Sequence, residues 1–147
     1  PPPPPPFNRY IIYTERAKTW HEALASCIQQ GGTLATIPTA LRNSELRAWA
    51  VVAGSSPIIW IGATDIEEEG VWRWVDTNAL ITWSNWRQSD KPVNQREHCA
   101  YMEVMNGEWE DYNCRKKLPY ACEARPPPAP HSAALTQLSP SPRLPPP

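Results

Sequence analysis

The apolar residues recur with a helical period in the first third of the chain, beside a short β-like segment. Residues 10–15, YIIYTE, are rich in β-branched and aromatic side chains and predict a strand. Thr19 and Glu22 form a T-x-x-E capping box, and the glycine pair at 31–32 marks the end of the helix that this box starts. The apolar positions between them fall on one helical face: Trp20, Ala23, Leu24, Cys27 and Ile28. The pattern predicts an amphipathic helix that turns Cys27 toward the core.

A second amphipathic helix is predicted after a short extended run at residues 33–37. Pro38 and Thr39 introduce it, and it runs to about Val52. Its predicted inner face consists of Leu46, Trp49, Ala50 and Ala53. Strands are then predicted at residues 58–65, 71–76, 99–104, 107–114 and 119–123. The order of one strand, two helices and then strands alone predicts an α+β domain, with two helices segregated from antiparallel sheets.

The connection between Asp76 and Cys99 is long and shows little regular pattern. A connection of this length in a compact domain is usually either functional or disordered. Its two tryptophans, its central Pro92 and the cysteine that closes it favour an ordered loop. We therefore treat this long loop as the first candidate for a binding surface.

Proline usage divides the chain into three parts. Of the 19 prolines, six open the chain and nine fall between Pro126 and Pro147, whereas all eight tryptophans and all four cysteines lie between these arms. We therefore expect a folded domain at residues 7–125, between a proline-rich linker at 1–6 and a proline-rich disordered tail at 126–147. The arms are expected to act as semi-rigid spacers, with a ligand for a proline-recognising domain as the alternative.

The cysteines indicate an oxidising compartment. Cys27, Cys99, Cys114 and Cys122 contain no C-x-x-C pair, so a zinc ribbon or a thioredoxin-like motif is a poor fit. Four cysteines in a tryptophan-rich, loop-rich domain favour two disulfides and an extracellular location, either secreted or on a cell-surface ectodomain. Spacing alone leaves three possible pairings.

Charge and missing motifs exclude several classes of function. The net charge of −1 suggests neither nucleic acid nor an anionic membrane as a partner. There is no apolar run long enough for a signal peptide or a membrane span, and we interpret the chain as a piece of a longer protein, attached to a membrane only through that parent. A Gly-rich phosphate loop, G-x-S-x-G and H-E-x-x-H do not occur, and no histidine has an obvious nucleophile to serve, so we do not expect an enzyme.

Six features in a fixed order resemble the C-type lectin-like domain. They are WIGATD, GVWRWVD, the long loop with its central proline, REHC, GEWEDYNC and LPYACE. The resemblance covers Tyr10 to Glu123 and implies the short form of that fold, with a long loop and the bridges Cys27–Cys122 and Cys99–Cys114. Four tryptophans are then expected in the core: Trp60, Trp72, Trp74 and Trp109.

The resemblance also implies a main calcium position in the long loop, which this sequence preserves only in part. Sugar-binding members use E-P-N or Q-P-D, a Glu before the second cysteine, and a W-N-D triplet. Here Lys91-Pro92-Val93 replaces the tripeptide, Glu97 is kept, and the triplet reads Trp109-Glu110-Asp111. An ammonium has no lone pair and a valine side chain has no oxygen, so we expect calcium to bind weakly or not at all. Lys91 is then predicted to act as the counter-charge of the acids, with three solvated acids as the alternative.

An auxiliary calcium position in the family is preserved somewhat better. By resemblance its ligands are Asp65, Glu69, Asn94 and Glu97, with His98 at the remaining position. Imidazole is a poor ligand for calcium, so this position is also incomplete.

We expect a non-catalytic extracellular binding module that recognises glycans or glycoproteins, with a degenerate calcium site. The candidate carbohydrate-binding residues are Trp86, Asp90, Lys91, Asn94, Glu97, Glu110 and Asp111. Trp86 is the best-placed aromatic to stack on a sugar, and packing in the core of the loop is the alternative for this residue. Many domains of this fold bind proteins without calcium, so a calcium-independent protein-interaction module is the second hypothesis.

Overall fold

A computed structural model describes residues 9–55, 57–88 and 96–124 of the chain. The first helix, α1, spans Trp20–Gln29, and the second, α2, spans Ala40–Val52. The predicted capping box is present, because Glu22 N–H donates to Thr19 Oγ1 at 3.3 Å and Thr19 N–H donates to Glu22 Oε1 at 3.0 Å. At the start of α2, Thr39 Oγ1 accepts from Arg42 N–H at 3.1 Å. Both predicted helices and their starting points are therefore confirmed.

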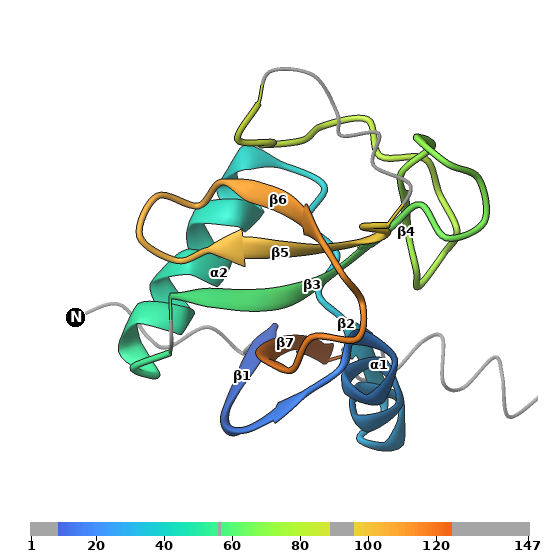
Figure 1. Cartoon of the computed structure of the whole chain (residues 1–147). Coiled ribbons are helices and arrows are strands. Elements are labelled where there is room, and N and C mark those ends of the chain that lie inside the picture. The colour runs from blue at the N-terminus through green and yellow to red at the C-terminus, as the bar shows by residue number, and fades with distance from the viewer. Residues whose placement is uncertain (1–8, 56, 89–95, 125–147) are drawn as a thin grey trace, which may run out of the picture.

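The strands form one seven-stranded sheet in the order β1-β7-β3-β5-β6, with β2 paired to β7 and β4 paired to β3 (Figure 1). Their bounds are β1 Tyr10–Lys18, β2 Gly32–Leu34, β3 Ile58–Thr64, β4 Arg73–Trp74, β5 Cys99–Glu103, β6 Trp109–Tyr112 and β7 Leu118–Ala124. The pairing is antiparallel except between β3 and β7, where Trp60 and Tyr120 are parallel neighbours. The predicted α+β fold is confirmed, and the sheet is mixed rather than wholly antiparallel.

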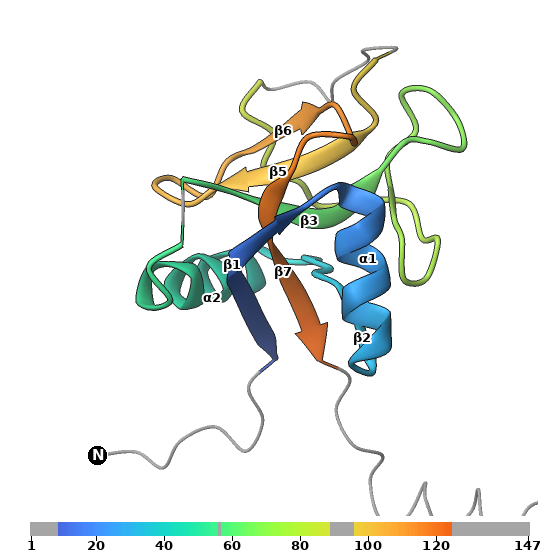
Figure 2. The same cartoon turned by 60° about the horizontal axis from the view of Figure 1, so that its bottom comes forward.

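The two helices lie on opposite sides of the β1–β7 pair, as Figure 2 shows. The first described residue and the last leave this pair together, because Ala124 N–H donates to the carbonyl of Arg9 at 2.8 Å. The loops before and after β4 lie together at one side of the molecule, beyond the end of β3 (Figure 1). Within the described parts of the chain, no helix is both long and apolar enough to span a bilayer.

Both disulfides connect the cysteines that the family resemblance implies. Cys27–Cys122 joins α1 to β7 with a Cα–Cα distance of 5.4 Å, and it closes a sequence separation of 95. Cys99–Cys114 joins the start of β5 to the turn after β6 with a Cα–Cα distance of 5.2 Å. The first bridge therefore ties the two ends of the domain together, and the second secures the base of the loop region.

The core is aromatic and depends on one buried amide. Trp60 and Trp109 are fully buried and Trp72 and Trp74 nearly so, which confirms their predicted place in the core. Asn43 of α2 is also buried: its Nδ2 donates to the carbonyl of Gly107 at 3.0 Å, and its Oδ1 accepts from Trp109 Nε1 at 2.8 Å. This amide links α2 to the β5–β6 turn.

Two details of the predicted elements are wrong. The buried face of α2 consists of Asn43, Leu46 and Ala50, so Trp49 lies at its edge, 39% exposed, and Ala53 is exposed. The strand predicted at 71–76 is only Arg73–Trp74, because a turn follows directly, with Asn78 N–H donating to the carbonyl of Trp74 at 2.8 Å. Amphipathic spacing alone did not separate a packed amide from an edge tryptophan.

Candidate functional site

Strand pairing gathers the predicted acidic residues at one end of the sheet. β3 pairs with β5 so that Thr64 is opposite Cys99, and β5 pairs with β6 so that Ala100 is opposite Asp111. The turn after β3 is fixed to the residue before Cys99, because the carbonyl of His98 accepts from Thr64 Oγ1 at 2.7 Å and from Asp65 N–H at 3.1 Å. The residues at 65–70, 97–98 and 110–111 therefore lie close together.

The auxiliary position is a compact group made by Asp65, Glu69 and His98. Single donor atoms of these three residues all lie within 4.8 Å of one another. Asp65 is buried, and its Oδ2 accepts from Gly70 N–H at 2.8 Å while its Oδ1 lies 3.0 Å from His98 Nδ1. Glu69 Oε1 lies 3.7 Å from the same nitrogen. Partial desolvation and the neighbouring Asp65 carboxylate raise the pKa of Glu69.

At the main position, protein groups already occupy the Glu110 carboxylate. The Tyr101 hydroxyl donates to Glu110 Oε2 at 2.5 Å, and Arg87 Nη1 lies 3.6 Å from the same oxygen. Arg87 Nη1 also lies 3.7 Å from Glu103 Oε2. Burial, together with the bond to Glu110, raises the pKa of Tyr101. The guanidinium of Arg87 thus balances the charge of Glu110. The sequence analysis predicted Lys91 as the counter-charge of the acids at this position.

Asp111 is the acid with an unused oxygen. Its Oδ2 is buried, and no residue in the described part of the chain hydrogen-bonds to it. Burial and, next, the Glu97 carboxylate raise the pKa of Asp111 to about 6, with smaller contributions from Glu110 and Asp65. The Asp111 carboxylate is therefore in a position where a proton, a cation or a hydroxyl donor would be favourable.

The tip of the long loop lies outside the described residues. The predicted site residues Asp90, Lys91 and Asn94 are in this segment, together with Pro92 and Val93. The proposed roles of these residues, including Lys91 as a counter-charge, therefore stay predictions.

Trp86 packs into the loop rather than standing free. Its ring centroid lies 4.8 Å from that of Trp72 and 5.6 Å from that of Trp109, and Trp83 also packs on Trp109 at 5.7 Å. The main chain holds this segment against β6, because Arg87 N–H donates to the carbonyl of Trp109 at 2.8 Å. Both loop tryptophans are partly buried, so the structure agrees with the packing alternative for Trp86.

Sequence reasoning missed Arg87 and Tyr101. The alternation in β5 places Tyr101 on the face of its cross-strand partner Glu110, and this register would have indicated the contact. Arg87 could not be found in this way, because its position depends on how residues 85–87 lie along Trp109.

The donor groups do not fit a calcium ion well. Calcium takes six to eight oxygen ligands. The described part of the main position offers Glu97, Glu110 and Asp111, and Glu110 already has two protein partners. The auxiliary position brings together two carboxylates and an imidazole; of its other predicted ligands, Glu97 is shared with the main position and Asn94 lies outside the described residues. Neither group of described residues completes a calcium shell.

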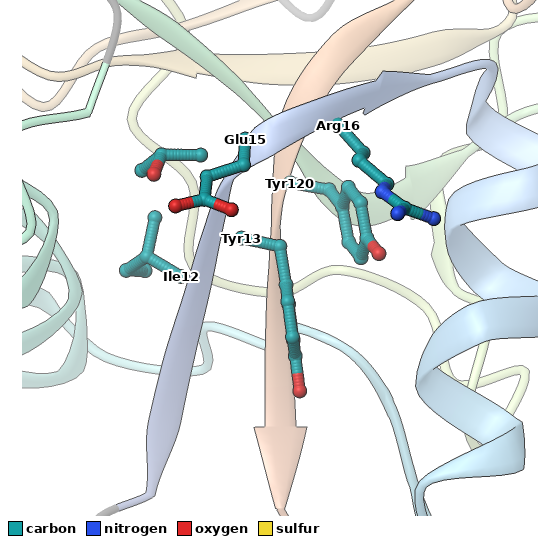
Figure 3. A pocket seen from close by; sticks show the side chains of 6 residues that line it. Ile12, Tyr13, Glu15, Arg16 and Tyr120 are labelled. Atoms are coloured by element: carbon teal, nitrogen blue, oxygen red, sulfur yellow. The ribbon is translucent and has the colours of Figure 1, made fainter.

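A shallow hollow lies apart from these residues, beside the irregular stretch of β1 (Figure 3). It measures about 360 Å³ and is lined by Ile12, Tyr13, Thr14, Glu15, Arg16 and Tyr120. Tyr13 stacks on Tyr120 with ring centroids 5.1 Å apart. The Tyr120 hydroxyl lies 2.8 Å from Ser26 Oγ, and the Tyr13 hydroxyl donates to Gln30 Oε1. The two rings therefore pack β1 and β7 against α1, and the lining includes none of the predicted site residues.

Comparisons with known proteins agree with this architecture. Residues 16–124 match the family model for the Lectin C-type domain. The chain is 39% identical to tetranectin of Mus musculus over 119 residues, which are 77% of this chain and 58% of that protein. It is 34% identical to C-type mannose receptor 2 of Mus musculus over 119 residues, which are 80% of this chain and 8% of the receptor. The chain thus spans less than two thirds of the length of tetranectin and a small part of the receptor.

Among solved structures, the chain is similar to the cow C-type carbohydrate-recognition domain of CD23, determined in the presence of a GlcNAc2Man3 oligosaccharide. It is 27% identical, covers 80% of this chain and 88% of its own, and superposes with a TM-score of 0.68.

Proposed function

We propose a function from one established premise: this chain belongs to the C-type lectin domain family. Members of this family are generally non-catalytic binding modules. We infer that the domain binds glycans or glycoproteins outside the cell, through the acids at the start of β5 and the end of β6, with a calcium site too degenerate to hold the ion firmly. The two disulfides favour an oxidising, extracellular setting.

The buried, unpaired oxygen of Asp111 is the observation that carries this proposal. A sugar presents several hydroxyl donors on one face, and a hydrogen bond from a hydroxyl to a carboxylate is short and strong. Asp111 Oδ2 has no such donor within the described chain, while Glu97 and Glu110 lie near enough to raise its pKa. A hydroxyl that reaches this oxygen would satisfy a group that is costly to leave buried and unpaired.

Two of the similar proteins have a sugar in their name or in the description of their structure, which supports the same proposal. C-type mannose receptor 2 is named for a sugar, and the CD23 domain was solved with an oligosaccharide present. Trp86 is packed on Trp72 and Trp109, so we place the recognition surface on the carboxylates and leave aromatic stacking a minor part.

A protein partner is the second candidate, and Arg87 is the observation that favours it. Arg87 is 55% exposed and lies 3.6–3.7 Å from the carboxylates of Glu103 and Glu110. A guanidinium at this place gives the surface mixed charge without any metal, as a calcium-independent protein interface would require.

A glycan array with the full chain separates the two candidates. We expect selective glycan binding that is similar in calcium and in excess chelator. Asp111→Asn should weaken binding at least about tenfold, since it removes one charge-assisted hydrogen bond. Glu45→Gln, which changes an exposed acid on α2, is the matched control and should bind like the parent chain.

Two results would contradict this expectation in different ways. Binding that disappears with the chelator would show that the calcium site is intact. An array with no glycan above background in either buffer would reject carbohydrate recognition and leave the protein partner.

A further inference from the structure

The group of Asp65, Glu69 and His98 has a donor set that differs in kind from the acids of β6. Two of its members are carboxylates and one is an imidazole, and their donor atoms lie within 4.8 Å of one another. The nitrogen His98 Nδ1 is the common centre, 3.0 Å from Asp65 Oδ1 and 3.7 Å from Glu69 Oε1. Asp65 and Glu69 lie in the turn after β3 and His98 immediately precedes β5, so the group includes no residue from the tip of the long loop.

These separations suit a small four-coordinate ion. Zinc bonds of about 2.0–2.2 Å to imidazole nitrogen and carboxylate oxygen place neighbouring ligand atoms roughly 3.3–3.5 Å apart in a tetrahedron. The observed separations of 3.0 and 3.7 Å lie on either side of that value. A small movement of the Glu69 side chain, which is partly open to solvent, would complete three corners of the tetrahedron and leave the fourth to water.

Hydrogen bonds around the group orient the Asp65 carboxylate and fix the main chain of His98. Gly70 N–H donates to Asp65 Oδ2 at 2.8 Å, which leaves Oδ1 directed to His98. The main chain of His98 is held through its carbonyl by Thr64 Oγ1 and by Asp65 N–H. Ligating carboxylates are usually hydrogen-bonded in this manner, and such outer contacts fix the ligand orientation.

The chemistry of the donors distinguishes between metals. Calcium and magnesium prefer shells made only of oxygen, whereas imidazole together with carboxylate suits zinc and other first-row transition ions. We propose that Asp65, Glu69 and His98 form a binding site for a divalent first-row transition-metal ion, with zinc as the first candidate, at the place where the family resemblance implied calcium. On binding, Nδ1 presents its lone pair to the ion and the ring carries its proton on Nε2.

The site can be tested on the full chain by calorimetric titration with zinc and, separately, with calcium. We expect one zinc ion per chain and much weaker binding of calcium. His98→Gln and Glu69→Gln should each weaken zinc binding by at least the 10–100-fold that is typical for losing an outer contact of a metal ligand. Both side chains are partly exposed, so these variants should fold, and a thermal melt without metal checks this.

The chain offers matched controls for each variant. His21→Gln changes an exposed histidine on α1, His131→Gln changes the third histidine of the chain, and Glu68→Gln changes the acid next to Glu69. All three should bind zinc like the parent chain. Cobalt substitution gives a second measurement, since a four-coordinate site should produce intense visible absorption that His98→Gln removes.

Three outcomes would overturn the proposal. Zinc binding that is absent would show that the Asp65–His98 contact serves the fold alone. Zinc binding that survives His98→Gln but is lost in His21→Gln or His131→Gln would place the ion elsewhere. Calcium binding as tight as zinc binding would restore the site that the resemblance implied.

Discussion

At the scale of single residues, the two neighbouring acids of β6 differ in the protein groups that meet their charge. The Glu110 carboxylate accepts a hydrogen bond from the Tyr101 hydroxyl and lies near the guanidinium of Arg87. Among the residues that the structure describes, none donates to Asp111 Oδ2, and the nearby Glu97 carboxylate adds a second negative charge. The Glu110 carboxylate therefore has protein partners, whereas the Asp111 carboxylate is the one that we propose for the ligand.

This difference predicts that the free energy of unfolding depends on pH through the titration of Asp111. Burial raises the pKa of Asp111 to about 6, whereas an aspartate in an unfolded chain has a pKa of about 3.9. The folded chain thus binds the proton more tightly than the unfolded chain. The contribution of Asp111 to stability is therefore fully present below the unfolded pKa and is lost as the pH rises through the folded pKa.

Asp111→Asn should remove this loss and raise the free energy of unfolding at neutral pH by about 1 kcal/mol, after allowance for solvent screening. Urea unfolding at pH values from below the unfolded pKa of Asp111 to neutral measures this change in the free energy of unfolding. Glu45→Gln is the control. A variant that is less stable than the parent chain at neutral pH would contradict the assignment. A variant that is more stable but no longer binds the glycan would show that Asp111 serves binding rather than folding.

At the scale of elements, the β5–β6 turn and α2 are held together through Asn43. Gly107 in this turn has φ +76°, and its carbonyl accepts from Asn43 Nδ2 and also from Asn85 Nδ2 at 2.8 Å. A Cβ added at Gly107 would lie 2.9 Å from Asn43 Nδ2. The turn therefore needs glycine both for its backbone conformation and for the close approach of the amide.

Two glycine substitutions separate these effects. Gly54→Ala has a similar φ of +68° with nothing within 4 Å of the added Cβ, so it should cost only the left-handed backbone penalty, about 1–2 kcal/mol. Gly107→Ala should cost about 1–3 kcal/mol more, because it also displaces Asn43 from its buried hydrogen bonds. Denaturant unfolding of both variants measures the difference, and equal costs would show that the amide contact contributes nothing.

The sequence predicted elements better than it predicted contacts. The capping box fixed the start of α1 through local hydrogen bonds, and the resemblance placed both disulfides correctly. The buried role of Asn43 could not be foreseen, because its partners Gly107 and Trp109 are more than sixty positions away. Arg87 escaped for a related reason, since loop packing rather than a local pattern places it beside Glu110.

At the scale of the whole molecule, the two disulfides have separate tasks. Cys27–Cys122 closes a sequence separation of 95 and holds α1 to β7, whereas Cys99–Cys114 closes a separation of 15 below the candidate site. The long closure constrains the unfolded chain more strongly. The short one lies directly beside His98 and the acids.

Replacing each cysteine pair with serine should reveal this division. Loss of Cys99–Cys114 should cost about 3 kcal/mol, and loss of Cys27–Cys122 about 4–5 kcal/mol. We expect the first variant to lose ligand binding while its far-ultraviolet circular dichroism stays close to that of the parent chain, and the second to show the lower melting temperature. Unchanged glycan binding after removal of Cys99–Cys114 would contradict a recognition surface at this end of the sheet.

The neighbouring exits of the chain at Arg9 and Ala124 determine how the domain would respond to mechanical load. Antiparallel β1 and β7 are paired from Tyr10 and Glu123 inward. Tension applied at these two ends would therefore break the Tyr10–Glu123 pair first. After the next pair, force on β7 reaches Cys122 and passes through the covalent bridge to Cys27. Residues 28–121, which contain every acid of the site, then lie outside the path of the force. Tension applied at the two ends of the described domain would then leave in place the surface that we propose for recognition.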